Sequence, residues 1–224
     1  MKLDSILDKL GIYDLVGVEL PGVCITVFLS VTLKLIFEID ITKLIPINHI
    51  FILLLAGYFL GIIFQELGSL IYRIVLNQND KMLREVLHSS NSDLYELSSE
   101  KAQEIQNIVM EKSGIKSVND REIYNYCKLY VFEKHGHSYF DKDQSLSAMS
   151  RSFACYFFFS AIFCFLRIFS CYNIEALKII FLFIAFSISL ALLMHYRCRR
   201  FAKMRYRNIL NLFYFDNKST EFSE

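Results

Sequence analysis

Four long, nearly uncharged apolar stretches dominate this sequence of 224 residues. A membrane-spanning helix needs about 20 mainly apolar residues, because the hydrocarbon layer is about 30 Å thick and each residue rises 1.5 Å. The stretch from Leu44 to Gln65 has this length without any charge. The other three reach it when one cation near an end is included (Lys34, Arg167 or Lys178), because long cationic side chains extend to the membrane surface. We therefore expect spans near residues 20–39, 46–68, 152–172 and 176–196.

The alternative is a soluble helical bundle with a very apolar core. The chain is 54% apolar and 21% charged, whereas soluble domains average about 45–50% and 25%. Segments 51–64 and 153–165 are apolar on every side, whereas a surface helix of a soluble protein has one apolar stripe. An all-α integral membrane fold is the favoured interpretation. The net charge of +1 gives no reason to expect nucleic acid as a main partner.

The distribution of Lys and Arg predicts how the chain is threaded. Fourteen Lys and Arg residues lie near the span ends that adjoin the N-terminal segment, the middle segment or the C-terminal tail. Four lie in the two short connections, one between the first and second spans and one between the third and fourth. Cytoplasmic flanks carry the excess of Lys and Arg. Both termini and the middle segment are therefore expected in the cytoplasm, at a bacterial inner membrane. No secretory signal is visible, so the first span is expected to be retained.

This threading divides the chain into five parts. Residues 1–19 form a cytoplasmic amphipathic segment, 20–68 a first transmembrane hairpin, and 69–150 a cytoplasmic helical lobe. Residues 151–196 form a second hairpin, and 197–224 a basic cytoplasmic tail. The expected fold is thus two transmembrane hairpins separated by a small helical insert.

Three helices are predicted in the lobe. The second span continues at helical spacing as a stalk until Ser89–Ser92. A second helix, about 97–113, ends at Gly114, a residue type common just past helix ends. A third begins at Asn119, with Glu122 at capping-box spacing. The segment His135–Asp143 is expected to break the chain before the third span.

Small residues in the second span indicate close helix packing. Gly57 and Gly61 form a G-x-x-x-G pattern, with Gly68 near the same side. Such spacing lets helix backbones approach closely. The pattern fits either self-association into a homo-oligomer or packing within one chain. At the edge of this span, an interfacial structural contact of Glu66, for which Arg73 and Arg151 are the candidate partners, is favoured over a role in a proton relay.

Polar residues follow one face of two spans. Thr26, Ser30 and Lys34 are spaced four apart in the first span, and Ser187 and His195 share a face of the fourth. In an oligomer these stripes would line a pore. The alternative is hydrogen bonding to neighbouring helices or to the helix's own carbonyls.

Signals for enzyme chemistry are weak. His135, His137, Asp141 and Asp143 contain metal-ligand residue types, but H-x-H followed by D-x-D in a loop has low specificity. Hydrolase, zincin and phosphate-loop motifs are absent from the sequence. The six cysteines contain no C-x-x-C pair. The chain is therefore expected to have no catalytic residue, metal or cofactor.

A basic cluster follows the last span. Attraction of a cation to anionic lipid headgroups contributes about 1 kcal/mol near the surface. We expect the cluster to bind membrane lipid through Arg197, Arg199, Arg200, Lys203, Arg205 and Arg207. The apolar tail from Ile209 to Phe215 is expected to lie on the membrane or to dock on the lobe.

Scattered positions resemble a group of small bacterial membrane proteins. They are the run Leu10–Leu15, Pro21-Gly22 at the first span, Met149-Ser150-Arg151 before the third, and the set Tyr58, Gly61, Gln65 and Gly68. In that group a short amphipathic helix precedes Pro-Gly, and four spans are split two and two. Members are similar to accessory membrane proteins of phage-defence loci, including the four-span partner of type VI-B CRISPR effectors. The resemblance implies no catalytic residues.

Two functions of different classes follow from these features. The first is an inner-membrane effector or accessory protein of antiviral (antiphage) defence, which oligomerises and perturbs membrane permeability when its lobe is triggered. The second is a membrane-anchored sensor or adaptor that conducts nothing and tethers a cytoplasmic protein partner. A membrane enzyme built around His135 and His137 is a third and weaker option.

Overall fold

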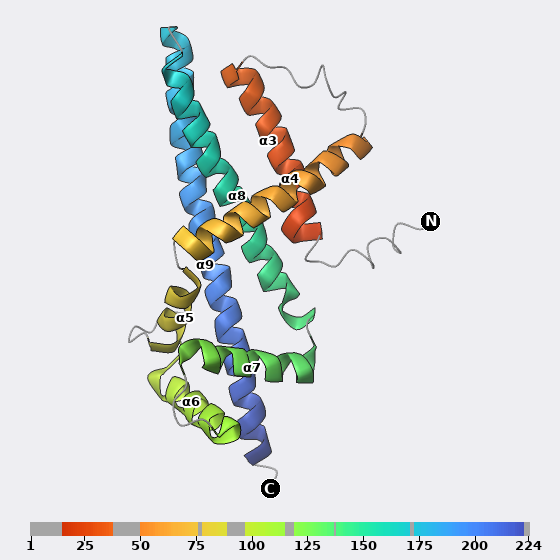
Figure 1. Cartoon of the computed structure of the whole chain (residues 1–224), viewed down its shortest axis with the longest axis vertical. Helices are drawn as coiled ribbons and strands as arrows, with labels where there is room; N and C mark the ends of the chain where they lie inside the picture. Colours follow the sequence, from red (N-terminus) through yellow and green to blue (C-terminus); the bar gives the residue numbers. More distant parts are fainter. Residues whose placement is uncertain are drawn as a thin grey trace. The chain divides into compact units, whose positions relative to one another are not determined.

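The computed structural model describes residues 15–37, 50–75, 78–88, 97–114, 119–136, 138–170 and 173–221, and these contain helices and no strand. The expected amphipathic segment before Leu15 and the Ser89–Ser92 run lie outside the described residues. The elements in chain order (Figure 1) are η1 (Leu15–Glu19), α3 (Leu20–Phe37), α4 (Ile50–Leu70), η3 (Ile71–Val75), α5 (Gln78–His88), α6 (Ser99–Ser113), α7 (Asp120–His135), α8 (Ser138–Ile168) and α9 (Ile174–Glu221).

Four segments of these helices are long and apolar enough to cross a membrane. They are Leu15–Lys34, Phe51–Ile74, Lys142–Ile168 and Ile174–Lys218. This confirms the prediction of an all-helical fold with four spanning candidates, and it indicates a multi-pass membrane protein.

Two helices extend well past the predicted spans. Helix α8 begins at Ser138, and α9 continues without interruption to Glu221. The predicted break over His135–Asp143 is therefore wrong from Ser138 onward. Neither helix contains Gly or Pro, and charged residues do not end a helix by themselves. The break is limited to the short junction at Gly136, whose φ is 80°.

The predicted stalk contains a π-helical turn. Helix α4 ends at Leu70 and is followed directly by the π-helical turn η3, and α5 covers Gln78–His88, with residues 76–77 outside the described part of the chain. A π-helical turn shifts the i→i+4 hydrogen-bond register, and hydropathy spacing does not reveal it. The end of the predicted stalk is nearly right, since α5 stops at His88.

The chain forms two compact units. The membrane unit comprises residues 1–71 and 145–198, and the lobe comprises residues 72–144 and 199–224. The chain passes between the units within η3, within α8 and again within α9. The tail that follows the last span therefore belongs to the same compact unit as α5, α6 and α7.

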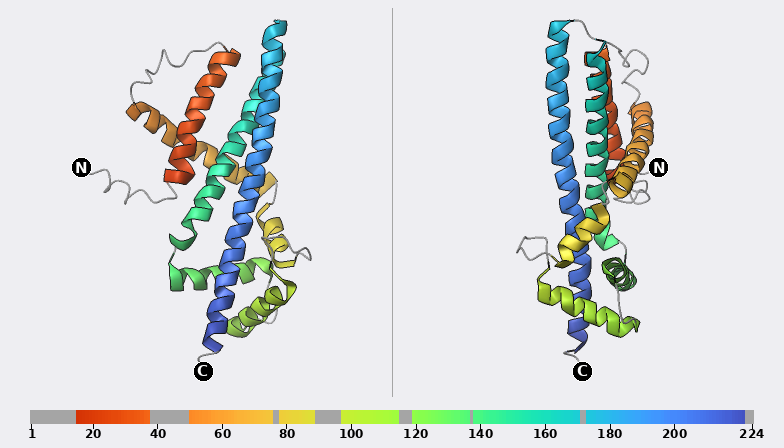
Figure 2. Two further views of the ribbon diagram at one scale, coloured as in Figure 1. Left: turned by 180° about the vertical axis from the view of Figure 1, so that it is seen from behind. Right: turned by 60° about the vertical axis from the view of Figure 1, so that its left-hand side comes forward.

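The membrane unit has a small aromatic core. Ile25 of α3 is fully buried against Phe153, Tyr156 and Phe157 of α8, and Phe64 of α4 packs on this cluster. Helix α8 and the first half of α9 lie side by side (Figure 2), with Cys164 packed against Ile180.

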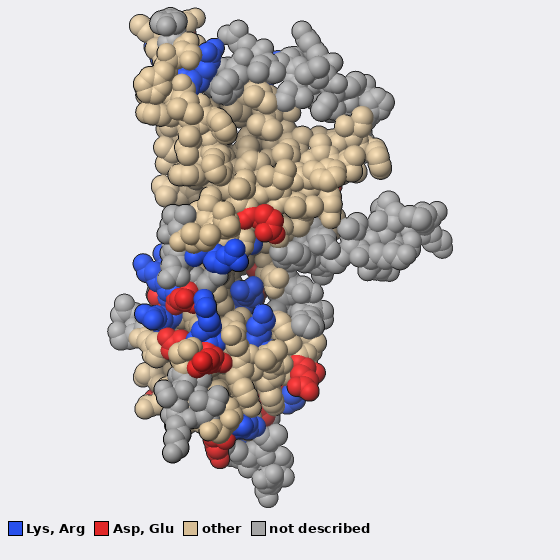
Figure 3. All heavy atoms as spheres, viewed as in Figure 1, with Lys and Arg blue, Asp and Glu red and all other residues tan. Residues whose placement is uncertain are grey.

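Much of the remaining apolar surface of the membrane unit is exposed, as for Phe51 (77%) and Leu182 (73%). The face drawn in Figure 3 has a broad region with few Lys, Arg, Asp or Glu side chains among the described residues. Exposed apolar surface on this scale suits contact with lipid.

The lobe has a larger core built by four helices. Side chains of α5, α6 and α7 pack around the second half of α9, which contributes the buried residues Ala202, Tyr206, Ile209, Leu210, Phe213 and Tyr214. This confirms docking of the apolar tail on the lobe. Ile209, Leu210 and Phe213 are completely buried.

The predicted helix ends of the lobe are confirmed. Ser98 caps the start of α6, and Gly114 ends it with a φ of 69°. Asn119 and Glu122 form the full capping box at the start of α7. These local signals place α6 and α7 so that Ile105, Val109, Ile123 and Val131 face the core.

Candidate functional site

The G-x-x-x-G glycines pack against the first span of the same chain. A Cβ added at Gly61 would lie 2.2 Å from the Val18 carbonyl oxygen, and one at Gly57 would lie 2.7 Å from Val23 Cγ2. On the other side, a Cβ at Gly22 would lie 1.8 Å from the Gly57 carbonyl oxygen. The absence of side chains at these positions therefore allows η1 and α3 to contact α4 closely. This face is covered within the chain, and self-association, which stays a prediction, would need another face.

The hydroxyls of the first polar stripe bond within their own helix. Thr26 donates to the Gly22 carbonyl and Ser30 to the Thr26 carbonyl, each over 2.8 Å. This is the geometry of the intrahelical alternative. Lys34 is exposed near the end of α3. A pore lined by these residues stays a prediction.

The second polar stripe lies in α9. The Ser187 side chain is completely buried, and its hydroxyl has no hydrogen-bond partner among the described residues. His195 is half-buried two turns further along the helix.

Gly68 faces a different helix from the other two glycines. A Cβ at Gly68 would lie 2.9 Å from Arg151 Cγ of α8. Glu66 is exposed, and within the described part of the chain it forms no ion pair with Arg73 or Arg151. The expected contact of Glu66 is therefore not formed.

Two residues of the basic cluster bind an acidic partner in the lobe. Arg199 Nη2 lies 3.0 Å from each carboxylate oxygen of Glu85, and Lys203 Nζ lies 2.8 Å from Oε2. Burial alone would raise the pKa of Glu85, but the hydrogen bonds and positive charges of Lys203 and Arg199 outweigh it and lower this pKa. The pairs tie α5 to α9, so these two cations have an intramolecular role besides any role at lipid.

Replacing Glu85 with glutamine is expected to destabilise the lobe by about 1 kcal/mol at pH 7, because partly buried ion pairs are lost while the side-chain shape is kept. A carboxyl with a lowered pKa stabilises the fold above its ordinary pKa, 4.5 here, and this contribution disappears as the pH falls through the lowered value. The difference between wild type and Glu85→Gln in thermal unfolding should therefore shrink as the pH falls below about 4.5.

The control for this prediction is Glu111→Gln, at an exposed glutamate of α6 that has no ion pair among the described residues. It should unfold at the same temperature as wild type both at pH 7 and below about pH 4.5. A Glu85→Gln protein with an unchanged unfolding temperature at pH 7 would show that the pairs contribute nothing to the lobe.

Arg205 belongs to a second group of contacts in the lobe. Its guanidinium lies 5.4 Å from the ring centre of Tyr206, which packs edge to face on Tyr124 at 4.8 Å. Burial raises the pKa of Tyr124 to about 12, although the charge and hydrogen bond of Arg205 act in the opposite direction. Tyr124 is therefore a neutral core residue near pH 7.

His135, a candidate metal ligand, is held by an aspartate. Its Nε2 lies 2.6 Å from Asp216 Oδ2, and Lys134 Nζ lies 3.3 Å from the other carboxylate oxygen. The contact joins the end of α7 to α9. A matching pair joins the start of α7 to α5, since His88 Nε2 lies 2.8 Å from Asp120 Oδ1.

The other candidate ligands do not gather around His135. Asp143 accepts a hydrogen bond from Asn208 over 3.1 Å. His137 and the side chain of Asp141 lie outside the described residues. Among the residues whose placement is described, no three His, Cys, Asp or Glu side chains are arranged to hold a metal ion.

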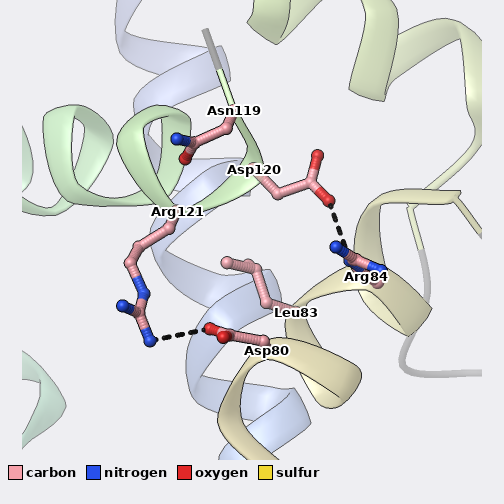
Figure 4. Close-up of a pocket in the computed structure, with 6 residues that line it drawn as sticks. All are labelled: Asp80, Leu83, Arg84, Asn119, Asp120 and Arg121. Atoms are coloured by element: carbon pink, nitrogen blue, oxygen red, sulfur yellow. Dashed lines mark ion pairs between the residues drawn. The ribbon is translucent and has the colours of Figure 1, made fainter.

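A polar cavity of about 410 Å³ lies between α5 and α7 of the lobe (Figure 4). Arg121 of α7 pairs with Asp80 of α5 over 2.9 Å, and Arg84 of α5 lies 3.9 Å from Asp120 of α7. Leu83 and Asn119 complete the lining. Every charged group of this lining has an opposite charge beside it, so the cavity is better suited to joining two helices than to holding a cofactor.

Sequence reasoning missed the acidic partners that organise the lobe. Glu85, Asp120 and Asp216 each bind cations from another helix. In each case the partner lies on another helix, so the sequence around the acidic residue carries no signal for it.

The chain matches no protein-family model, and comparison with curated proteins and with solved structures finds nothing similar to it.

Proposed function

We propose that this protein is a membrane-anchored sensor or adaptor. Two transmembrane hairpins would hold the helical lobe at the cytoplasmic face of a bacterial inner membrane, where the lobe binds a soluble protein partner. The threading follows from the excess of Lys and Arg around the lobe.

The single observation that carries this proposal is the continuity of α9. This helix of 48 residues begins in the apolar segment of the membrane unit and ends in the lobe. Its second half supplies the centre of the lobe core, including the fully buried Ile209 and Phe213. The lobe therefore cannot complete its core without the extension of a membrane helix, which suits a lobe that works at the membrane.

The outer surface of α7 offers a contact for a partner. Leu129 is 70% exposed and is flanked on the same side of the helix by exposed Asn125 and Glu133. A large apolar side chain surrounded by polar ones is a common composition for a transient protein contact. Helix α7 is also held at both ends by His–Asp pairs, so this surface is presented by a fixed element.

An adaptor requires no pore, and two observations favour it over a conducting protein. The hydroxyls of Thr26 and Ser30 already bond to carbonyls of their own helix, and the Gly57–Gly61 face is covered by η1 and α3. Pore formation in antiphage defence stays a prediction that requires a homo-oligomer assembled through a different face.

Photo-cross-linking in intact bacterial cells tests the proposal. A cross-linking amino acid at Leu129 should give one discrete protein adduct, which disappears when Phe213→Ala disrupts the lobe. The same group at lipid-facing Phe158, which is 53% exposed, should not give that adduct. Ion conductance by the purified protein in liposomes, together with no Leu129 adduct, would overturn the adaptor in favour of the pore.

A further inference from the structure

Arg151 is a charged side chain without an ion-pair or hydrogen-bond partner among the described residues. Its Nε atom is buried and has no acceptor among those residues. An arginine keeps its charge at any physiological pH, and its planar fork suits two oxygens of one phosphate or carboxylate. A buried donor of this kind is costly to leave unpaired.

The residue before Arg151 in α8 also carries an unpaired buried polar group. Ser150 is completely buried, and its hydroxyl also has no partner among the described residues. Neighbouring serines are satisfied: Ser147 contacts Cys198 Sγ at 3.6 Å, and Ser152 donates to the Ala148 carbonyl over 3.1 Å. The unpaired donors are therefore confined to positions 150 and 151 of this stretch.

Arg151 lies where two spans approach their ends. It directly precedes the uncharged stretch from Ser152 to Leu166 in α8, and Gly68 near the end of α4 lies beside it. A side chain at position 68 would collide with the Arg151 stem, so the glycine leaves room for that stem. With the third span beginning near residue 152, as the sequence predicts, Arg151 would lie at the level of lipid headgroups.

The nearest acidic residues of α4 and η1 do not neutralise Arg151. Glu66 lies two residues before Gly68, which places it on the opposite side of α4, and it is exposed. Glu19 of η1 likewise forms no ion pair within the described residues.

We propose that Arg151 binds the phosphate group of a phospholipid headgroup at the α4–α8 contact, with a preference for an anionic lipid. This role is separate from that of the basic cluster after the last span, in which Arg199 and Lys203 already bind Glu85. It rests on the membrane placement of the spans and not on the adaptor function.

The test measures lipid retention by the full-length protein in detergent, using native mass spectrometry during titration with phosphatidylglycerol. Arg151→Gln should weaken the tightest phosphatidylglycerol site about tenfold, as expected for loss of one charge-assisted bidentate contact. Arg151→Lys keeps the charge but loses the fork, and it should fall between wild type and Arg151→Gln. The control is Arg167→Gln in the same helix, near the end of the span, which should retain lipid like wild type.

Two further arms identify the source of the phosphate. Inorganic phosphate should not displace phosphatidylglycerol. Wild type should bind phosphatidylcholine more weakly than phosphatidylglycerol, whereas Arg151→Gln should bind the two lipids alike. Equal retention by wild type and a folded Arg151→Gln protein would overturn the proposal, as would displacement by inorganic phosphate. If Arg151→Gln fails to fold, Gly68→Ala, which pushes the Arg151 stem aside, should show the same loss of lipid, and unchanged retention in it would reject the site.

Discussion

Gly61→Leu should remove the packing of the first span against the second and cost at least about 3 kcal/mol. Its Cβ alone would lie 2.2 Å from the Val18 carbonyl oxygen. The atoms in the way belong to the backbone of η1, which cannot rotate aside like a side chain, so the helices must separate. Thermal unfolding of the purified protein in detergent should show a clear loss of melting temperature.

The matched control for Gly61→Leu is Ala185→Leu, at an exposed position of α9. It adds an apolar side chain of the same kind at an exposed position, and it should melt near wild type. A Gly61→Leu protein that keeps its melting temperature but loses an oligomer would show that the glycines serve self-association instead.

Phe213→Ala should unfold the lobe. Phe213 is completely buried, and the rings of Tyr126 and Tyr130 pack edge to face on it at 6.1 and 5.2 Å. Removing a buried phenyl ring costs about 3–5 kcal/mol, and the flanking aromatic contacts are lost with it. Since the lobe is small, this is a large part of its stability. Hydrogen exchange of α5, α6 and α7 should accelerate together.

Phe215→Ala, two residues further along α9, is the matched control for Phe213→Ala. Phe215 is 56% exposed, and its ring contacts Lys101 Nζ at 4.9 Å and the Tyr214 ring at 5.7 Å. Its loss should change exchange in the lobe by less than about 1 kcal/mol. Similar exchange in the two variants would mean that the second half of α9 does not form the lobe core.

Local sequence signals predicted a large part of this fold. Charge-free length identified the four spanning candidates, and the Asn119–Glu122 capping box and Gly114 set the ends of α7 and α6 within a residue or two. These features depend on residues close together in the chain, so one sequence is enough to find them.

The features that were missed depend on partners distant in the chain. Arg199 and Lys203 looked like lipid ligands because nothing local shows that Glu85 lies beside them. Helix α9 extends far past its span because no glycine or proline stops it, whereas the prediction ended it at the first cations. The π-helical turn η3 in the stalk was also missed, because apolar spacing carries no signal for it.

Whether the lobe lies on the cytoplasmic side is tested most directly by cysteine accessibility in intact bacterial cells. In a cysteine-free background, Ser170→Cys in the exposed turn before α9 and Ser99→Cys at the exposed start of α6 provide matched probes. We predict that a membrane-impermeant maleimide labels Ser170→Cys in intact cells and labels Ser99→Cys only after the inner membrane is permeabilised. Labelling of Ser99→Cys in intact cells, with Ser170→Cys protected, would contradict the threading and the adaptor function together.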